Sequence, residues 1–301
     1  KPFTTGEWRH ASGADDLAAD GGLDVKVGIG TNLVLDASWR TDFSQVETDA
    51  QQINLTRFSL FFPEKREFFL ENQGAFQIGP PAGNASNLVP FFSRTIGLST
   101  AGTPIPIVAG ARLTGKVGNN QVGVMAAVDD QAGSSFDSHP VYGIVRASHD
   151  LGPGSRIAGL WTEQHDGDAS NRVLGIDGRL VIKGINSITW NAAYAHDSRN
   201  GIVTSAPIWS AGFRRAGRNL RLNYSMNAVP GDFITRSGLI GQRDVANVVI
   251  DHSYTWLLGK KTVESVTGGV SVQGTWKYDN FVHGAEILNR YLHFNTNARL
   301  K

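Results

Sequence analysis

Apolar and polar residues alternate with a period of two along most of this chain. In residues 23–29 and 33–39 every second residue is apolar, and a turn at Thr31 and Asn32 separates the two runs. Successive side chains of a β-strand point to opposite faces of the sheet. The two runs therefore predict a hairpin with one apolar face and one polar face.

The same alternation continues almost without interruption from Pro106 to the end of the chain. The predicted strands run for about ten residues, the length of a tilted transmembrane strand and about twice that of an ordinary strand. Tight turns, such as Pro153-Gly154, alternate with longer polar connections at residues 165–171 and 197–203. Short turns at one end and longer loops at the other are typical of outer-membrane barrels.

The pattern thus predicts an all-β fold, an antiparallel transmembrane β-barrel with roughly 12–14 strands in this chain. We expect one domain over residues 1–301, made of a polar leader over 1–21, an irregular plug-like segment over 42–80 and a strand meander over 106–301.

Both ends of the sequence lead us to expect a fragment of a longer protein. The first residue is Lys1 rather than Met, and the alternation still continues where the chain stops at Lys301. Bacterial outer-membrane barrels usually finish on an aromatic residue, which this sequence lacks. We therefore expect an incomplete barrel, without its closing strand.

Residues 42–78 interrupt the alternation and form the densest run of charged and aromatic residues in the chain. Pro63 prevents a helix from continuing through it from upstream. The four charges that follow cannot face lipid, because each would need a partner or water. We therefore expect this segment inside the barrel or at its periplasmic mouth. The candidate lumen residues are Arg57, Glu64, Lys65, Arg66, Glu67 and Glu71, and the candidate aromatic anchors are Phe61, Phe62, Phe68 and Phe69.

Two interpretations of these residues remain open. The charges form either a constriction that selects polar solutes or a salt-bridge cluster that pins an inward loop to wall residues such as Arg40, Arg112 and Lys116. The phenylalanines either anchor the loop by burial, at about 1.5–3 kcal/mol each, or provide a stacking surface for sugars. The salt-bridge cluster and the buried anchors are the commoner outcomes, and we favour them.

Composition excludes several classes of function. The net charge of +1 gives no electrostatic reason to expect nucleic acid as a partner. Charged residues make up 18% of the chain, below the roughly 25% of typical soluble domains. The chain has no cysteine, and no apolar run is long enough for a membrane helix. Residues 165–168 contain carboxylates but lack the remainder of a calcium loop. We expect no metal site and no cofactor.

The stretch from Asp42 to Phe76 resembles the signature of a bacterial protein family known as domain of unknown function 5916. Residues 91–97 (FFSRTIG) and 104–116 (PIPIVAGARLTGK) are also similar to that family, whereas Glu67 stands where a proline is common and Asn72-Gln73 where glycine is expected. The resemblance implies an outer-membrane barrel, often preceded by a family-9-type carbohydrate-binding module. It implies no activity and therefore no catalytic residue.

Three functional hypotheses follow for a protein that we expect in the outer membrane of Gram-negative bacteria, in contact with its lipid. The first is a restricted, porin-like pore or surface protein that takes up or handles oligosaccharides or other polymers. The second is a non-conducting anchor or scaffold for an N-terminal carbohydrate-binding module. The third is a barrel-embedded hydrolase built on His149, His165 or His196. We expect no enzyme, because no Gly-x-Ser-x-Gly nucleophile motif occurs.

Overall fold

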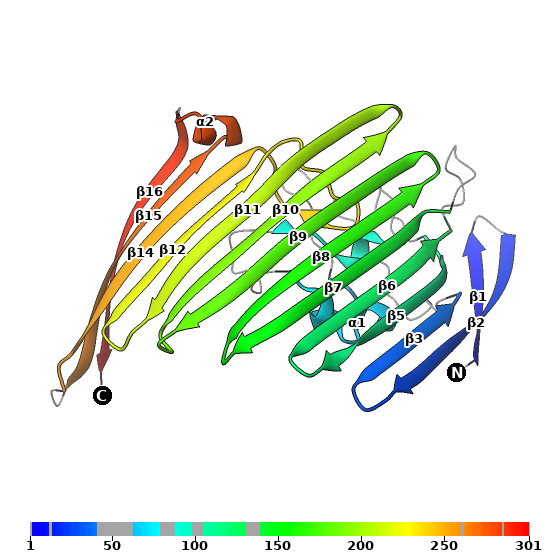
Figure 1. Ribbon diagram of the computed structural model, residues 1–301, viewed down its shortest axis with the longest axis horizontal. Helices are drawn as coiled ribbons and strands as arrows, with labels where there is room; N and C mark the ends of the chain where they lie inside the picture. The colour runs from blue at the N-terminus through cyan, green and yellow to red at the C-terminus, as the bar shows by residue number, and fades with distance from the viewer. Residues whose placement is uncertain are drawn as a thin grey trace.

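The alternating sequence forms one very large antiparallel sheet. The computed structural model describes residues 2–11, 14–40, 63–78, 88–97, 105–130, 139–259, 262–284 and 286–300. Fourteen strands, each paired with its neighbours along the chain, make up the sheet (Figure 1). They are β1 (Pro2–Ala11), β2 (Ala14–Ile29), β3 (Leu33–Trp39), β5 (Ile107–Val117), β6 (Asn120–Asp129), β7 (Val141–Gly152), β8 (Ser155–Asp166), β9 (Ala169–Ile182), β10 (Asn186–Arg199), β11 (Ile202–Ala216), β12 (Leu220–Val229), β14 (Val245–Leu257), β15 (Val263–Trp276) and β16 (Ile287–Leu300).

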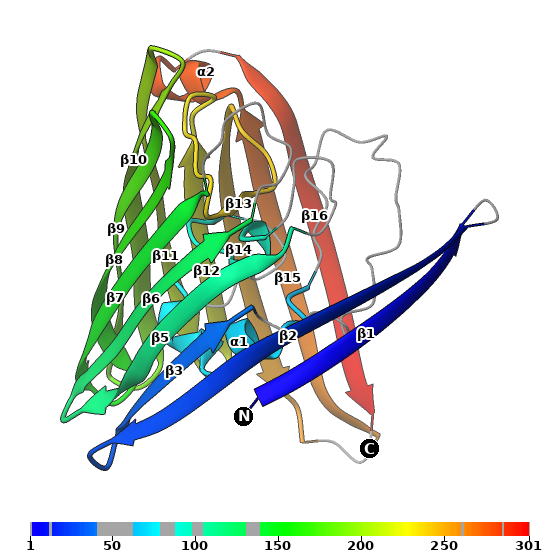
Figure 2. The same ribbon diagram turned by 90° about the vertical axis from the view of Figure 1, so that its right-hand side faces the viewer.

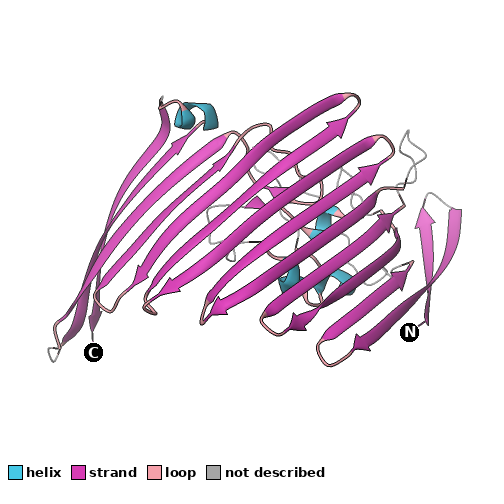
Figure 3. Cartoon of the chain, viewed as in Figure 1, coloured by secondary structure: helices cyan, strands magenta, loops and turns pink. Residues whose placement is uncertain are grey.

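The prediction of an all-β, antiparallel fold is confirmed (Figure 3). The described helices are single turns: α1 (Glu67–Leu70), α2 (Tyr278–Val282) and the 3-10 turns η1 (Gln73–Phe76) and η2 (Ser93–Thr95). Two short strands, β4 (Leu88–Val89) and β13 (Leu239–Ile240), form a separate small sheet. No helix among the described residues has the length and apolar content needed to cross a membrane.

The sheet bends into a trough but does not close. Figure 2 shows it curving around the inner elements, with β1 and β2 along one side of the opening and β16 along the other. In the described part of the chain, β1 and β16 are the two edges of the sheet and are not paired with each other. The closed barrel is therefore not observed.

Strands also occur where the alternation predicts none. The polar stretch 1–21 forms β1 and the beginning of β2, which pair from Pro2 opposite Leu23 to Ala11 opposite Ala14. A ladder of backbone hydrogen bonds does not require an apolar face, so a test based on hydrophobic periodicity does not find such a hairpin.

The prediction of longer polar loops at residues 165–171 and 197–203 is wrong, because both connections are two-residue turns. Strand β8 continues to Asp166 and β9 begins at Ala169, so that Gly167 and Asp168 alone connect them. Residues Asn200 and Gly201 likewise form a two-residue turn between β10 and β11, with φ values of 53° and 76°. Asn-Gly accepts the positive φ values of a tight hairpin turn, and this local preference outweighs the polarity of the surrounding residues.

The register places apolar side chains in continuous rows on the convex face. One row crosses β3 to β10, and neighbouring members pair directly: Leu35, Leu113, Val124, Val145, Trp161, Leu174 and Tyr194. Exposure in this row reaches 42% at Val124 and 64% at Leu174. The next row of the same strands, on the concave face, is buried and contains Asp36, Arg112, Met125, Ile144, Thr162, Val173 and Ala195.

Two inward segments lie within the trough. The first, residues 63–97 as far as described, carries α1, η1, β4 and η2; the second, residues 230–244, carries β13. Phe69, Phe76 and Ile96 of the first segment pack in one dry cluster with concave-face residues such as Ile144 and Leu160. Phe233 and Ile240 of the second pack in another, with residues of β9 to β11. Apolar burial thus occurs between the inward segments and the sheet.

Candidate functional site

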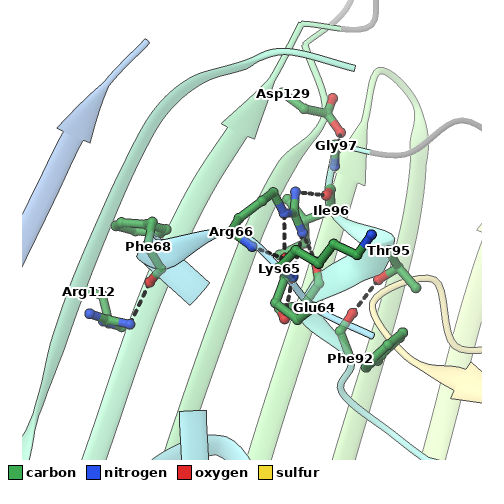
Figure 4. Close-up of polar contacts among 11 residues, drawn as sticks. Glu64, Lys65, Arg66, Phe68, Phe92, Thr95, Ile96, Gly97, Arg112 and Asp129 are labelled. Carbon is green, nitrogen blue, oxygen red and sulfur yellow. Dashed lines mark hydrogen bonds and ion pairs between the residues drawn. The ribbon is translucent and has the colours of Figure 1, made fainter. Parts of the chain in front are cut away.

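A buried ion pair forms the centre of the first inward segment. The Arg66 guanidinium donates from Nε to Glu64 Oε1 and from Nη2 to Glu64 Oε2, both at 2.7 Å. The two side chains are only 2% and 3% exposed. Arg66 also donates to the carbonyl oxygens of Ile96 at 2.6 Å and Ser93 at 2.7 Å (Figure 4). The pair therefore joins the start of α1 to the turn η2, about thirty residues further along the chain.

The environment of Glu64 determines its charge. Burial alone would raise the pKa of this carboxyl, but hydrogen bonds and the positive charge of Arg66, with a hydrogen bond from the Ser93 hydroxyl, lower it overall. The Ser93 hydroxyl donates to Glu64 Oε2 at 2.7 Å. A buried charge is tolerated when its partners satisfy it in this way. Arg66 also lies 4.2 Å from the centre of the Phe69 ring, an additional favourable contact.

Arg112 attaches this segment to the wall. It projects from β5 into the trough, is 1% exposed, and donates from Nη1 to the carbonyl oxygens of Phe68 and Glu71 at the end of α1. Its Nη2 donates to Asp36 Oδ2 of β3 at 2.6 Å. Because the last carbonyl groups of a helix lack partners within it, one arginine satisfies them and fixes the position of α1 on the wall.

A second attachment lies at Gly97. Its backbone N–H donates to Asp129 Oδ2 of β6 at 3.3 Å, and the Tyr142 hydroxyl donates to the same oxygen at 3.0 Å. Gln164 in turn donates to the Tyr142 hydroxyl at 3.3 Å. Polar residues of three adjacent strands thus hold the end of the described segment.

The second inward segment is not predicted from the sequence. Arg236 forms a two-pronged ion pair with Asp197 of β10, at 2.7 and 2.9 Å. Asn171 of β9 accepts from the backbone N–H of Arg236 and donates to the carbonyl of Ile234. Two features of the sequence indicate that the strands are interrupted here: the loss of alternation between residues 229 and 245, and the Pro230-Gly231 pair.

The two inward segments also bind each other. Thr235 donates to the carbonyl of Pro90 at 3.0 Å, and the backbone N–H of Phe92 donates to the carbonyl of Ser237 at 2.7 Å. Strands β4 and β13 pair beside these contacts. A Cβ atom at Gly238 would lie 2.4 Å from the Pro90 carbonyl oxygen, so only glycine allows this approach.

The predicted lumen residues take different positions. Glu64 and Arg66 are buried, Glu71 is half-buried and bonded to Arg112 and Lys26, and Lys65 and Glu67 are exposed. Of the predicted wall partners, Arg112 contacts the segment, whereas Lys116 pairs with Asp150 of β7. The predicted residues Arg57, Phe61 and Phe62 lie outside the described residues.

The two described aromatic anchors pack against each other and against the wall. Phe69 is 1% exposed, and Phe68 meets it edge to face at 5.0 Å between ring centres. Phe68 rests on Gly110 of β5, where a Cβ atom would come within 2.9 Å of its ring. Phe76 rests on Gly123 of β6 at the same distance. The aromatic rings therefore pack against glycines of the wall, which agrees with anchoring by burial.

Two histidines of the hydrolase hypothesis, His149 and His196, contact neutral side chains. His196 Nδ1 lies 2.8 Å from Ser205 Oγ on the exposed side of the sheet. The adjacent Asp197 points to the opposite face and binds Arg236 there. His149 Nδ1 lies 2.8 Å from the amide oxygen of Asn120. In neither of these two contacts does the histidine bind a carboxylate, as the histidine of a catalytic triad does.

A large cavity remains between the inward segments and the wall of β9 to β15. The described residues around it enclose about 1250 Å³. Phe69, Phe76, Phe91 and Phe92 line the side of the inward segments, mostly through buried rings. Amides and hydroxyls line the strand side in paired rows, among them Thr189, Asn191, Ser210, Ser225, Asn227, Asn247 and Gln273. The cavity can therefore hold water and a polar solute.

Comparison with known families gives one match. Residues 1–114 match the family described as Domain of unknown function (DUF5916). The match covers β1 to β3, the first inward segment and most of β5, and it confirms the resemblance for these residues. No curated protein matches the chain.

We predict that Arg66→Met destabilises the fold far more than Lys65→Met. Removing Arg66 leaves the Glu64 carboxylate buried without its ion-pair partner, which costs about 3–5 kcal/mol. Lys65 is exposed and next to it in sequence, so it serves as a matched control for the loss of one positive charge. Urea unfolding of the refolded protein measures both changes. Equal losses in the two variants would show that the buried pair does not hold the segment.

The lowered pKa of Glu64 predicts a loss of stability in acid. A carboxyl whose pKa is lower in the folded state contributes stability above its unfolded pKa of about 4.3 and loses it as the pH falls through the folded value. The difference in unfolding free energy between the wild-type protein and Glu64→Gln should therefore be constant above about pH 5.5 and shrink in stronger acid. Urea titrations between pH 3 and 7 measure it. A difference that does not change over this range would contradict the assignment.

Proposed function

We propose that this protein, a member of the DUF5916 family over residues 1–114, is an integral outer-membrane β-barrel protein. Its lumen is narrowed by the two inward segments, and it passes or binds small polar solutes. The observation that carries the proposal is the polarity of the sheet, with large apolar side chains exposed on the convex face and charged and polar side chains buried on the concave face.

This polarity of the sheet fits a hydrocarbon environment better than water. Exposed large apolar residues recur at every second position, for example at Leu23, Val25, Val27 and Ile29. On the concave face, Asp36, Arg112, Arg146, Asp177 and Asp197 are buried. Soluble proteins rarely expose one continuous apolar surface of this kind. A bilayer stabilises such a surface, and all strands between the two edges form their backbone hydrogen bonds with neighbours, as hydrocarbon requires.

Strand length and the positions of aromatic residues support the same proposal. In the large sheet, the strands from β5 to β16 contain between 10 residues, in β6 and β12, and 15, in β11, enough for a tilted strand to span the hydrocarbon core. Trp39 is exposed at the end of β3, and Tyr254 and Trp256 are exposed near the end of β14. Aromatic residues at both ends of the strands are characteristic of the two membrane interfaces.

The polar cavity favours a restricted pore over a filled barrel. An anchor without conductance needs a lumen packed by its own side chains, whereas the described residues leave about 1250 Å³ beside β9 to β15. Amide and hydroxyl groups on its wall suit hydrated, hydroxyl-rich solutes such as oligosaccharides. Phe69 and Phe76 belong both to the first dry cluster and to the wall of this cavity. The first inward segment therefore narrows the lumen beside the cavity.

The second candidate is a non-conducting anchor or scaffold that holds a carbohydrate-binding module at the cell surface. It is favoured by the two dry clusters, because they attach both inward segments firmly to the wall. It differs from the first candidate in one measurable property, the passage of solutes.

We predict that Leu174→Arg prevents stable insertion into lipid. Leu174 lies in the middle of β9 on the convex face, where an arginine near the bilayer midplane costs about 2–4 kcal/mol. Asn227→Arg places the same side chain on the concave face beside the cavity and should be tolerated. Urea titration of refolding into lipid vesicles gives both values. Normal insertion of Leu174→Arg would remove the membrane proposal.

We predict that replacing residues 63–78 by Gly-Ser repeats of equal length increases conductance. The replacement removes α1 and η1, including Phe69 and Phe76 at the edge of the cavity. Single-channel recording in planar bilayers and liposome swelling with small sugars measure passage. Substitution of the outward-facing Arg172, which pairs with Glu163, is the control. If neither the wild-type protein nor the replacement conducts, the protein is an anchor and not a pore.

A further inference from the structure

The concave face carries arginines that no carboxylate neutralises. Arg179 of β9 and Arg214 of β11 both line the cavity, and both side chains are exposed to it. Within the described ranges, neither forms an ion pair or a side-chain hydrogen bond. By contrast, the deeper pair of Arg146 and Asp177 on the same face is buried and mutually compensated.

The strand register increases the positive charge at this place. Arg179 lies directly opposite Arg156 of the neighbouring strand β8. Like charges in directly opposite positions destabilise a sheet. Arg156 in turn lies opposite Asp150, but that carboxylate already accepts a hydrogen bond from Lys116. This row of Asp150, Arg156 and Arg179 therefore holds two cations and one carboxylate, and the carboxylate also binds Lys116 from outside the row.

The nearest acid on the cavity wall does not reverse this balance. Asp251 of β14 is the carboxylate that lines the described cavity, and its two oxygens accept hydrogen bonds from Asn223 and Ser271. It is separated from Arg214 by the whole width of β12, because Asn223 pairs with both Arg214 and Asp251. Arg214 is thus left available to a ligand.

Arg179 and Arg214 are close enough to share one anion. Thr189 of β10 pairs with Arg179 and with Gly212, two residues before Arg214 on β11. Two strand spacings and two residues along a strand put the Cα atoms of the two arginines roughly 12 Å apart. Long side chains that extend from the same face toward the space between them can converge over that distance.

We propose that the cavity binds a hydroxyl-rich solute that carries an anionic group, a carboxylate or a phosphate, and that Arg179 and Arg214 bind this group. The inference rests on the proposed function in one respect, that the concave face encloses a lumen open to solutes. The planar guanidinium forms two parallel hydrogen bonds to a carboxylate or phosphate, which a neutral sugar cannot accept in the same way.

The remainder of the wall suits the hydroxylated part of such a solute. The side chains of Asn191, Asn227 and Gln273 point into the cavity from β10, β12 and β15, and none of them bonds to another described side chain. Each amide offers both donors and an acceptor, which matches the hydroxyl groups of a sugar. The volume exceeds the roughly 300–1,000 Å³ typical of small-molecule sites, so a solute of several rings fits.

Isothermal titration of the detergent-solubilised protein tests the proposal. The probes are a trimer of galacturonic acid, glucose 6-phosphate and the neutral trimer maltotriose, each at low and high salt. We expect at least one acidic probe to bind about tenfold or more tightly than maltotriose, with a difference that shrinks as salt increases. The preferred acidic probe identifies the group as a carboxylate or a phosphate.

Three variants locate the site. Arg179→Gln and Arg214→Gln should each weaken the binding of the acidic probe about tenfold and leave maltotriose unchanged. Arg172→Gln, on the opposite face of the same strand as Arg179, should change neither. Unchanged far-UV circular dichroism shows that each variant is folded, and Arg214→Lys tests for partial recovery by a charge without the guanidinium fork.

Two results would overturn the proposal: equal binding of acidic and neutral probes by the wild-type protein, or a preference for acids that survives both arginine substitutions. Failure here is separate from failure of the pore proposal, because the titration requires no passage of solute. A protein that prefers acids through these arginines but does not conduct keeps the binding site and loses the pore.

Discussion

The whole structure depends on one constraint: the charged groups on the concave face must be paired or reach water, while the convex face remains apolar. Arg112 meets it through its two terminal nitrogens, which donate to the end of α1 and to Asp36, and Arg66 meets it with Glu64 and two carbonyl groups. Since each guanidinium carries five donors in a fixed fork, a single side chain can fix one segment of the chain in place. The inward segments are thus attached by charge, and apolar packing around Phe69 and Phe233 excludes water from the attachments.

The interior is divided by this arrangement. One dry cluster lies against β5 to β8 and the other against β9 to β11, and amides and hydroxyls surround a cavity beside β9 to β15. The part with the dry clusters gives rigidity, because buried ion pairs are costly to break. The cavity leaves room for a hydrated solute and retains arginines without a described partner. On β9 to β11, structural attachment and candidate binding therefore use different positions of the same strands, such as Val173 in the dry cluster and Arg179 at the cavity.

Much of the fold follows from the sequence, because the period-two alternation is strong from residue 106 onward. The apolar face predicted over residues 23–29 and 33–39 agrees with the observed register, in which Val25 lies opposite Ala37 and Val27 opposite Leu35. Local turn chemistry explains the errors, since Asn200-Gly201 closes a hairpin that polarity alone suggests as a loop. The hairpin of β1 and β2 is missed because backbone pairing leaves no signal in hydrophobic periodicity.

The candidate site is less predictable. Dense charge singles out Glu64 and Arg66, and a wall partner is expected in Arg112, but the sequence does not say which carbonyl groups these side chains bind. Residues 230–244 contain four charged residues and one aromatic, and their loss of alternation with Pro230-Gly231 indicates only a connection. The sequence therefore does not identify them as a second inward segment before Arg236 is seen to bind Asp197. Long-range partners of this kind depend on the register of the entire sheet. The opposition of Arg156 and Arg179 is another example.

The measurement that tests the central claim most directly is a fluorescence scan of β9 in lipid vesicles. The chain has no cysteine, so single cysteines at each position from 172 to 180 can carry a label without background. The account predicts that labels at Leu174, Ile176 and Leu180 are quenched by spin-labelled lipid tails, and that the label at Arg179, which lines the cavity, is quenched by an aqueous reagent instead. Aqueous quenching at every position, with none from lipid, would contradict it.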